Sequence, residues 1–161
     1  MPEIIKVGIA DLNICKPPNM ITTIGLGSCV GIAIRDKQNK IGGLVHVMLP
    51  NSKEVRSNGN PAKFADTGIP ELVRKLEMLG GVRSRMVAKI AGGATMFSFQ
   101  SKSELMGIGD RNVAATKQAL TELGIPILAE DTGANYGRTV TFDPETGDYE
   151  VKAVGKPLKV I

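Results

Sequence analysis

Two apolar stretches separated by a polar turn stand out in the first third of the sequence. Val30, Ile32 and Ile34 alternate with small or polar residues, and a second apolar run covers residues 41–49. The segment between them, Asp36-Lys-Gln-Asn-Lys40, is entirely polar. Alternation with a period of two, interrupted by turn residues, is typical of a β-hairpin. The sequence therefore predicts an antiparallel strand pair, and with it a fold that contains a β-sheet.

A cysteine and the single histidine flank this hairpin. His46 is the only histidine, and it has two candidate partners, Cys15 and Cys29. If the turn centres between residues 37 and 38, Cys29 lies directly opposite His46, with Cβ atoms about 4.5–5.5 Å apart. A slip of one residue would move the two side chains to opposite faces of the sheet. The local pattern therefore favours a Cys29–His46 pair, provided that the strands adopt this register.

Cys29 and His46 are residue types that cysteine hydrolases require. The thiolate is the nucleophile, and a neighbouring imidazole or imidazolium keeps it ionised at neutral pH. Gly25 and Gly27 permit a tight turn, in which backbone N–H groups from Gly27 through Ser28 to the cysteine can face a developing oxyanion. Each side chain also has an ordinary alternative, because most cysteines behave as small buried hydrophobic residues and a lone histidine is more often structural.

Five motifs follow in fixed order between residues 23 and 138. They are Thr23-Ile-Gly-Leu-Gly-Ser-Cys-Val30 with His46-Val-Met-Leu-Pro50, Lys63-Phe-Ala-Asp66, Lys89-Ile-Ala-Gly-Gly-Ala-Thr-Met-Phe97, Ile108-Gly-Asp-Arg-Asn-Val113 and Glu130-Asp-Thr-Gly-Ala-Asn-Tyr-Gly-Arg138. Together they resemble the CheD family of chemoreceptor glutamine deamidases over most of the chain. One departure is Ala134, where the family usually has a second glycine, so the shape of this loop is open.

The resemblance implies an activity and a set of site residues. CheD proteins hydrolyse the side-chain amides of particular chemoreceptor glutamines, and the resulting glutamates serve as methylation sites. By this resemblance Cys29 is the nucleophile, His46 the base and Thr23 the third catalytic residue. The residues alone do not distinguish Thr23 from the adjacent Thr22, and the ordinary interpretation of either is a β-strand threonine.

The resemblance also implies a partner and a fold. Many CheD proteins bind CheC, a phosphatase of the response regulator, so a CheC-type phosphatase is expected beside the chemoreceptors. The implied fold is a compact α/β sandwich similar to the catalytic domain of bacterial toxins that deamidate glutamine. A different class of function, a non-catalytic adaptor that binds a CheC-type phosphatase, is the alternative. The complete set of Thr23, Cys29 and His46 favours the enzyme, because a pure binding protein would not need it.

Composition sets the broad class. With 161 residues, one domain covering 1–161 is expected, and this length suffices to bury a core. Two cysteines form no disulfide framework, and no segment has the pattern of a signal peptide or of a membrane span, so a reduced cytoplasmic setting is expected without membrane insertion. The net charge is +4 with scattered basic residues and only 4% aromatics, which disfavours nucleic acid and suits an acidic partner such as a receptor.

Periodicity predicts the remaining elements. Strands are expected near residues 4–9, 86–90 and 125–129, and a β-hairpin from residues 138–142 and 149–154. One helix is expected within residues 64–79, kinking at Pro70 or starting anew there, and a second from Gly109 or Asp110 to about Leu123. Residues 51–61 read as a mobile loop beside the site. The fold class is therefore α/β (α+β-like), a single-domain sandwich of mixed β-sheets with two main helices on one side.

Three further groups of residues are candidate sites. Gly92-Gly93 lacks the spacing and the following lysine of a phosphate-binding loop, so no nucleotide is expected. Glu130 and Asp131 have no second histidine beside them, so no metal or other cofactor is expected, and turn hydrogen bonds are their ordinary role. Met96-Phe97 is equally compatible with a partner surface and with core packing.

Overall fold

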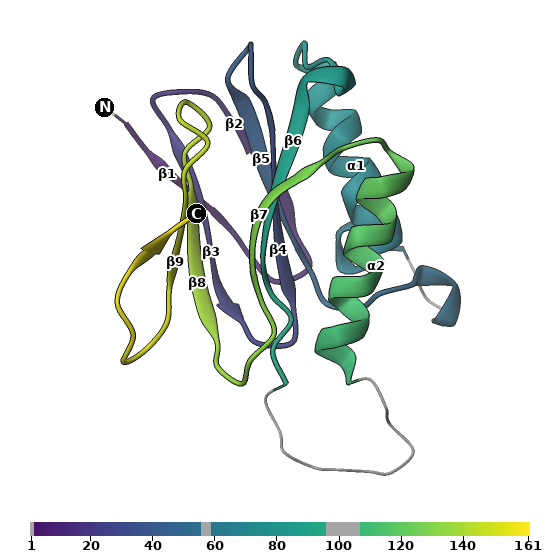
Figure 1. The fold of residues 1–161 in the computed structure, drawn as a ribbon. Coiled ribbons are helices and arrows are strands. Elements are labelled where there is room, and N and C mark those ends of the chain that lie inside the picture. The colour runs from purple at the N-terminus through teal and green to yellow at the C-terminus, as the bar shows by residue number, and fades with distance from the viewer. Residues whose placement is uncertain (1, 56–58, 96–106) are drawn as a thin grey trace.

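The computed structural model of the chain describes residues 2–55, 59–95 and 107–161. In this part of the chain, two five-stranded sheets lie face to face, and two long helices cover the outer face of one sheet (Figure 1). The structure therefore has three layers: helices, sheet and sheet. This confirms the expected α/β sandwich of α+β character with its two main helices on one side.

The sheet that carries the helices has the strand order β2-β5-β4-β6-β7. Its strands are β2 (Leu12–Cys15), β4 (Val30–Asp36), β5 (Ile41–Val47), β6 (Met86–Gly92) and β7 (Ile127–Thr132). β7 runs parallel to β6, and every other neighbouring pair is antiparallel. The hairpin that the sequence predicts is the β5–β4 pair at the centre of this sheet. Strand β2 was not expected.

The second sheet has the order β1-β3-β8-β9-β10. Its strands are β1 (Ile4–Val7), β3 (Met20–Leu26), β8 (Arg138–Phe142), β9 (Tyr149–Lys152) and β10 (Lys159–Val160). β1 pairs in parallel with β3, whereas β8 and β9 form the expected antiparallel hairpin. Strands β3 and β10 were not expected. β3 brings Thr23 into the interior.

The register of the β4–β5 hairpin differs from the prediction by two residues. Gly31, not Cys29, lies opposite His46, and the turn centres between residues 38 and 39. The Asp36 carboxylate fixes this turn by accepting the N–H groups of Gln38 and Asn39 at 2.9 and 3.2 Å. A shift of two residues leaves the facing of every side chain unchanged. The direct cross-strand pairing of Cys29 with His46 is therefore wrong, but the two stay on the same side of the sheet.

Helices α1 (Ala65–Met78) and α2 (Ile108–Glu122) match the two expected helices. Of the two alternatives expected at Pro70, a new helix start is wrong, because α1 begins five residues earlier and contains the proline. A proline inside a helix costs about 3 kcal/mol, whereas each fully buried aliphatic side chain contributes about 1.5–3 kcal/mol. The buried stripe of α1 outweighs the proline, and its large members are Ile69, Leu72, Val73 and Leu76.

Two cores hold the layers together. One lies between the helices and the first sheet and contains Ile32, Val45 and Leu72. The other lies between the two sheets and contains Leu26, Leu44 and other buried residues. Along β5, Val45 and Val47 face the helices, whereas Leu44 faces the second sheet. Alternation then directs His46 toward the second sheet as well, between the layers.

The connections carry three short 3-10 helices, η1 (Ser52–Glu54), η2 (Pro61–Lys63) and η3 (Arg83–Arg85). η1 lies within the loop expected over residues 51–61, and η2 begins at its last residue. The mobility of this loop stays a prediction. Met96-Phe97 lies outside the described residues, and so do residues 98–103, whose polar sequence predicts a loop. Neither long helix in the described part of the chain combines the length and apolar character needed to cross a membrane.

Candidate active site

His46 is completely buried between the two sheets and is hydrogen-bonded to Thr23. The Thr23 hydroxyl oxygen lies 2.7 Å from His46 Nδ1 and 2.7 Å from the carbonyl oxygen of Val7. The hydroxyl has one proton, and only donation to Val7 avoids two bare oxygens in contact, so Nδ1 must carry a proton and donate it to Thr23. The structure thus assigns the Nδ1–H tautomer to neutral His46 and leaves Nε2 as the basic nitrogen.

Thr22 has a different role from Thr23. Its hydroxyl donates to the carbonyl of Val140 at 2.6 Å and accepts a hydrogen bond from the Thr141 hydroxyl at 3.1 Å. Both contacts lie within the second sheet, between β3 and β8. Of the two threonines that sequence reasoning left open, Thr23 is therefore the one that contacts the histidine.

The Nε2 atom of His46 is buried and has no hydrogen-bond partner among the described residues. Burial lowers the pKa of His46 to about 4, since the charged ring is poorly solvated there. The ring is therefore neutral at pH 7. An unpaired buried acceptor costs free energy, and such groups concentrate where a structure keeps a reactive atom available.

Cys29 lies in the bend just before β4, is partly exposed, and packs against the core between the sheets. It precedes Gly31, the residue opposite His46, by two positions, and diagonal neighbours of this kind have spacings of about 7–8 Å. Among the hydrogen bonds of the described residues, none joins its thiol to His46. Burial raises the pKa of Cys29, and its own backbone N–H opposes this shift. Both pKa shifts favour a neutral thiol and a neutral imidazole at rest over an ion pair.

Cys15 is poorly placed to be the alternative nucleophile. It lies on β2 opposite Gly42, four residues before His46, which is about 13 Å along a strand. Burial, followed by the nearby Asp143 carboxylate, raises the pKa of Cys15 to about 11. Its thiol donates to the Asn19 carbonyl at 3.8 Å. These contacts are those of a core cysteine.

The turn that carries Cys29 is fixed through its carbonyl groups. The N–H groups of Ala94 and Gly93 donate to the carbonyls of Gly27 and Cys29, both at 2.8 Å. The intervening carbonyl, of Ser28, accepts from Asn112 Nδ2 at 2.9 Å. On the donor side, Gly27 gives its N–H to the Gly25 carbonyl at 3.1 Å. The N–H of Gly27, one of the expected oxyanion donors, is therefore occupied.

Two glycines at the end of β6 explain one of the sequence motifs. A Cβ atom on Gly92 would lie 2.2 Å from the Cys29 carbonyl oxygen, and one on Gly93 would lie 2.3 Å from the Val113 side chain. Both residues have positive φ angles, of 112° and 67°. Gly92-Gly93 therefore serves the close approach of β6 to the cysteine turn, which accounts for the pair without a phosphate.

The acidic pair at residues 130 and 131 makes ion pairs within the fold. Glu130 pairs with Lys117 at 3.0 Å, and Asp131 pairs with Arg138 at 3.2 Å and with Lys159 at 3.5 Å. Arg138, which is buried, also donates to the carbonyls of Gly133 and Tyr136 at 2.9 and 3.3 Å. The last motif thus organises the loop that approaches Thr95, whose N–H donates to the Ala134 carbonyl.

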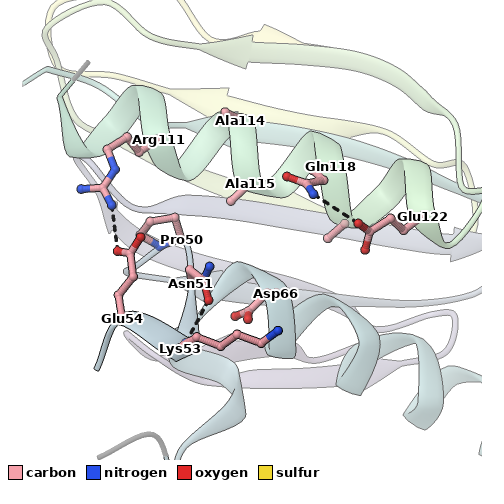
Figure 2. A pocket seen from close by; sticks show the side chains of 11 residues that line it. Pro50, Asn51, Lys53, Glu54, Asp66, Arg111, Ala114, Ala115, Gln118 and Glu122 are labelled. Atoms are coloured by element: carbon pink, nitrogen blue, oxygen red, sulfur yellow. Dashed lines mark hydrogen bonds and ion pairs between the residues drawn. The ribbon is translucent and has the colours of Figure 1, made fainter. Parts of the chain in front are cut away.

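A cleft lies beside the site rather than in it. Figure 2 shows its two walls, η1 with the preceding Asn51 on one side and α2 on the other, bridged by an ion pair between Glu54 and Arg111 at 2.8 Å. Asp66 lies on the η1 side of the cleft, where its carboxylate accepts hydrogen bonds from the N–H and the hydroxyl of Ser52, both at 2.9 Å. None of Thr23, Cys29 and His46 lines this cleft.

Sequence reasoning missed the contribution of Asn112 and Arg138. Both occur in the motifs quoted above, yet nothing local to either residue indicates its partners. Asn112 reaches a carbonyl that is 84 residues away in the sequence. Only the packing of α2 against the cysteine turn reveals this contact.

The fold and this site define a class of two-sheet α/β proteins with a buried Thr–His pair beside a cysteine turn. The family model for CheD, described as chemotactic sensory transduction, matches residues 48–153. The chain belongs to the CheD family.

Full-length relatives extend the match to residues before 48. A protein of Lachnoclostridium phytofermentans named probable chemoreceptor glutamine deamidase CheD is 60% identical over 161 residues, covering 100% of both chains. Proteins of the same name from Clostridium novyi and Clostridium botulinum are 52% and 55% identical, and each match covers 98% of this chain and 97% of the relative. The cysteine turn and the His46 strand therefore fall within the matched length.

Proposed function

We propose that this protein is a cysteine hydrolase that deamidates specific glutamine side chains of chemoreceptors to glutamate and releases ammonia. Relatives of matching length carry the name chemoreceptor glutamine deamidase. The observation that carries the mechanism is the Thr23–His46 hydrogen bond, which leaves Nε2 unprotonated and unpaired on the same side of the sheet as Cys29. A non-catalytic adaptor would have no use for such a nitrogen.

In the first half-reaction, Cys29 is the nucleophile. His46 Nε2 takes the thiol proton as Sγ attacks the amide carbon, because both groups are neutral at rest. The negative charge that forms on the amide oxygen is stabilised by backbone N–H groups of the cysteine turn. The imidazolium then returns its proton to the amide nitrogen, the C–N bond breaks, and ammonia leaves a thioester on Cys29.

In the second half-reaction, water replaces ammonia. Neutral His46 takes a proton from water, the resulting hydroxide attacks the thioester, and the C–S bond breaks. The thiolate recovers its proton from His46, and the product is a glutamate side chain. Thr23 acts throughout by fixing the ring and its tautomer, since a hydroxyl orients the imidazole without adding the charge that a carboxylate supplies.

Replacement of each cysteine tests this proposal. Cys29→Ala should abolish ammonia release from a chemoreceptor cytoplasmic fragment, and mass spectrometry should no longer detect conversion of its glutamines to glutamates. Cys15→Ala is the matched control and should keep the activity. If Cys29→Ala deamidates the fragment like the wild type, the cysteine mechanism is wrong, whereas inactivity of the wild type would favour the adaptor.

The finer substrate and partner assignments are also proposals. We propose a receptor surface rather than free glutamine as substrate, so turnover of free glutamine should be poor. We also propose that a CheC-type phosphatase docks close to the site and competes with the receptor, in the cytoplasm where thiols stay reduced. Competition assays check this: unchanged deamidation at saturating phosphatase would eliminate the shared surface and leave the catalytic assignment intact.

A further inference from the structure

Asn112 on α2 is completely buried and forms hydrogen bonds to two segments of the site. Its Nδ2 donates to the carbonyls of Ser28 and Met48, both at 2.9 Å. The first lies in the cysteine turn, and the second follows β5, two residues after His46. The amide orientation is fixed by these contacts, since the reverse orientation would press Oδ1 against two carbonyl oxygens.

The contact with Ser28 completes a pattern in which the carbonyls of residues 27, 28 and 29 are all held by donors. The peptide bonds here are trans, because the cis bond among the described residues is the one between Pro17 and Pro18. In a trans peptide the C=O and the N–H of one unit point in opposite directions. A donor that holds the Ser28 carbonyl therefore sets the direction of the Cys29 N–H.

The Cys29 N–H has no acceptor in another residue among the described ones, and neither has the N–H of Ser28. We infer that Asn112 is a positioning residue that aims the Cys29 backbone N–H at the oxyanion of the deamidation reaction. This inference rests on the proposed cysteine mechanism. It assigns the two oxyanion donors to Ser28 and Cys29, since Gly27 has given its N–H to Gly25.

The surroundings of Asn112 suit a rigid support. α2 begins against the Gly93-Ala94 segment so closely that a Cβ atom on Gly109 would lie 2.4 Å from the Ala94 carbonyl oxygen. The Oδ1 atom of Asn112 is buried and has no partner among the described residues. An unpaired buried acceptor lowers stability, so stability alone does not explain an asparagine at this position.

The test variant is Asn112→Leu, which keeps a similar shape and removes both donors. Loss of one oxyanion donor lowers kcat by about a hundredfold or more, and a misaimed donor should lower kcat by about tenfold to a hundredfold. KM for a chemoreceptor cytoplasmic fragment should stay unchanged. Thr116→Val, one turn further along α2 and equally buried, is the matched control and should keep the wild-type kcat.

A second readout separates aiming from general support of the site. The reaction of the Cys29 thiolate with methyl methanethiosulfonate forms a mixed disulfide and releases methanesulfinate. No tetrahedral oxyanion forms at a carbonyl carbon, so the limiting rate of this reaction at high pH should be the same in Asn112→Leu as in the wild type. Thermal unfolding checks the fold, and Asn112→Ala is measured instead if the leucine variant does not fold. Unchanged kcat, or a parallel fall in the limiting thiol rate, would overturn the inference. Activity in Cys29→Ala would instead overturn the underlying mechanism.

Discussion

The hydroxyl of Thr23 connects the two sheets by holding Nδ1 of His46 at 2.7 Å, with its own proton directed to a backbone carbonyl. The two hydrogen bonds have a fixed direction, because the Nδ1 proton can go only to Thr23 and the hydroxyl proton only to the Val7 carbonyl. The ring is therefore held in one tautomer before any substrate arrives. A hydroxyl suffices for this purpose in a buried site, where a carboxylate would bring a charge that itself needs compensation.

Removal of the Thr23 hydroxyl should impair catalysis more than folding. Thr23→Val keeps the β-branched shape but leaves Nδ1 without its acceptor, so the ring loses its orientation and its preferred tautomer. We expect kcat to fall by about a hundredfold, the lower range for loss of general acid–base catalysis. Ammonia release from a chemoreceptor fragment measures the effect, and Thr23→Ser should restore most of the activity.

The neighbouring threonine provides the control. Thr22→Val removes a hydroxyl that is also buried on β3 but bonds within the sheet. Its unfolding free energy should fall by about 1–3 kcal/mol, as for other variants that leave a buried partner unpaired. Its kcat should stay at the wild-type value. Equal losses of activity in the two variants would show that the strand, and not the Thr23–His46 bond, is what matters.

The pH dependence follows from the neutral pair. His46 accepts the thiol proton only when its ring is neutral, and burial lowers its pKa to about 4. Activity should therefore fall as the pH drops through about 4 and stay on a plateau from there to neutrality. The measurement is kcat/KM against pH, with circular dichroism at each point, because protonation of a buried ring also destabilises the folded state. A midpoint near pH 6.5, the ordinary value for histidine, would contradict the neutral pair.

Thiol labelling tests the same pair from the cysteine side. Because burial raises the pKa of Cys29, iodoacetamide should label it slowly at about pH 6. Labelling should become faster only when the pH reaches or exceeds the pKa of an ordinary thiol. Cys15, whose pKa is raised to about 11, should label later still. Peptide mass spectrometry resolves the two cysteines. Rapid labelling of Cys29 at acidic pH that disappears in His46→Asn would restore the ion pair.

The sequence could predict features that depend on local pattern. Alternation located the strands at residues 30–36 and 41–47, and helical periodicity located α1 and α2 to within a few residues. The sequence does not predict strand β3, because Thr22, Thr23 and Gly25 interrupt its apolar pattern. It does not predict β10 either, because that strand has only two residues. The hairpin register was missed because a buried carboxylate, that of Asp36, sets the turn, and its burial depends on the tertiary fold.

Properties of the site that depend on burial could not be predicted from the sequence either, because burial depends on the tertiary fold. The motifs suggested Cys29 and His46 as partners, but the signs of their pKa shifts follow from the two sheets closing over them. The family resemblance favoured Thr23 over Thr22, but the residues alone did not distinguish them, because alternation does not give the orientation of β3. Asn112 carried no signal of its own, because its two acceptors are contributed by distant turns.

The buried ion pair of Asp36 with Arg85 should make stability sensitive to acid. Burial raises the pKa of Asp36, but hydrogen bonds from Arg85 and from the N–H groups of Val82, Asn39 and Gln38 outweigh this and lower it. A carboxylate whose pKa is lower in the folded state stabilises the fold at pH values above its unfolded-state pKa, about 3.9. This stabilisation is lost as the pH falls below that pKa toward the folded-state pKa. Urea unfolding at about pH 7 and about pH 3 measures the loss.

Asp36→Asn should remove this acid sensitivity and lower the unfolding free energy at neutral pH by about 3 kcal/mol, because it leaves Arg85 without its buried partner. Glu71→Gln breaks an exposed pair with Arg74 and should cost less than about 1 kcal/mol. Identical acid sensitivity in the wild type and in Asp36→Asn would assign it to another carboxylate.

Ala134 occupies a backbone conformation that favours glycine, so its replacement should stabilise the protein. Its φ angle is 60° and its side chain is exposed. A left-handed conformation costs an alanine about 1–2 kcal/mol, and the greater freedom of glycine in the unfolded chain offsets about half of this. Ala134→Gly should therefore raise the unfolding free energy by about 0.5 kcal/mol. Ala114→Gly, at an exposed position of α2, should lower it by about 1 kcal/mol. Thermal unfolding of the two variants measures both signs, and a loss of stability in Ala134→Gly would mean that the loop holds the alanine without strain.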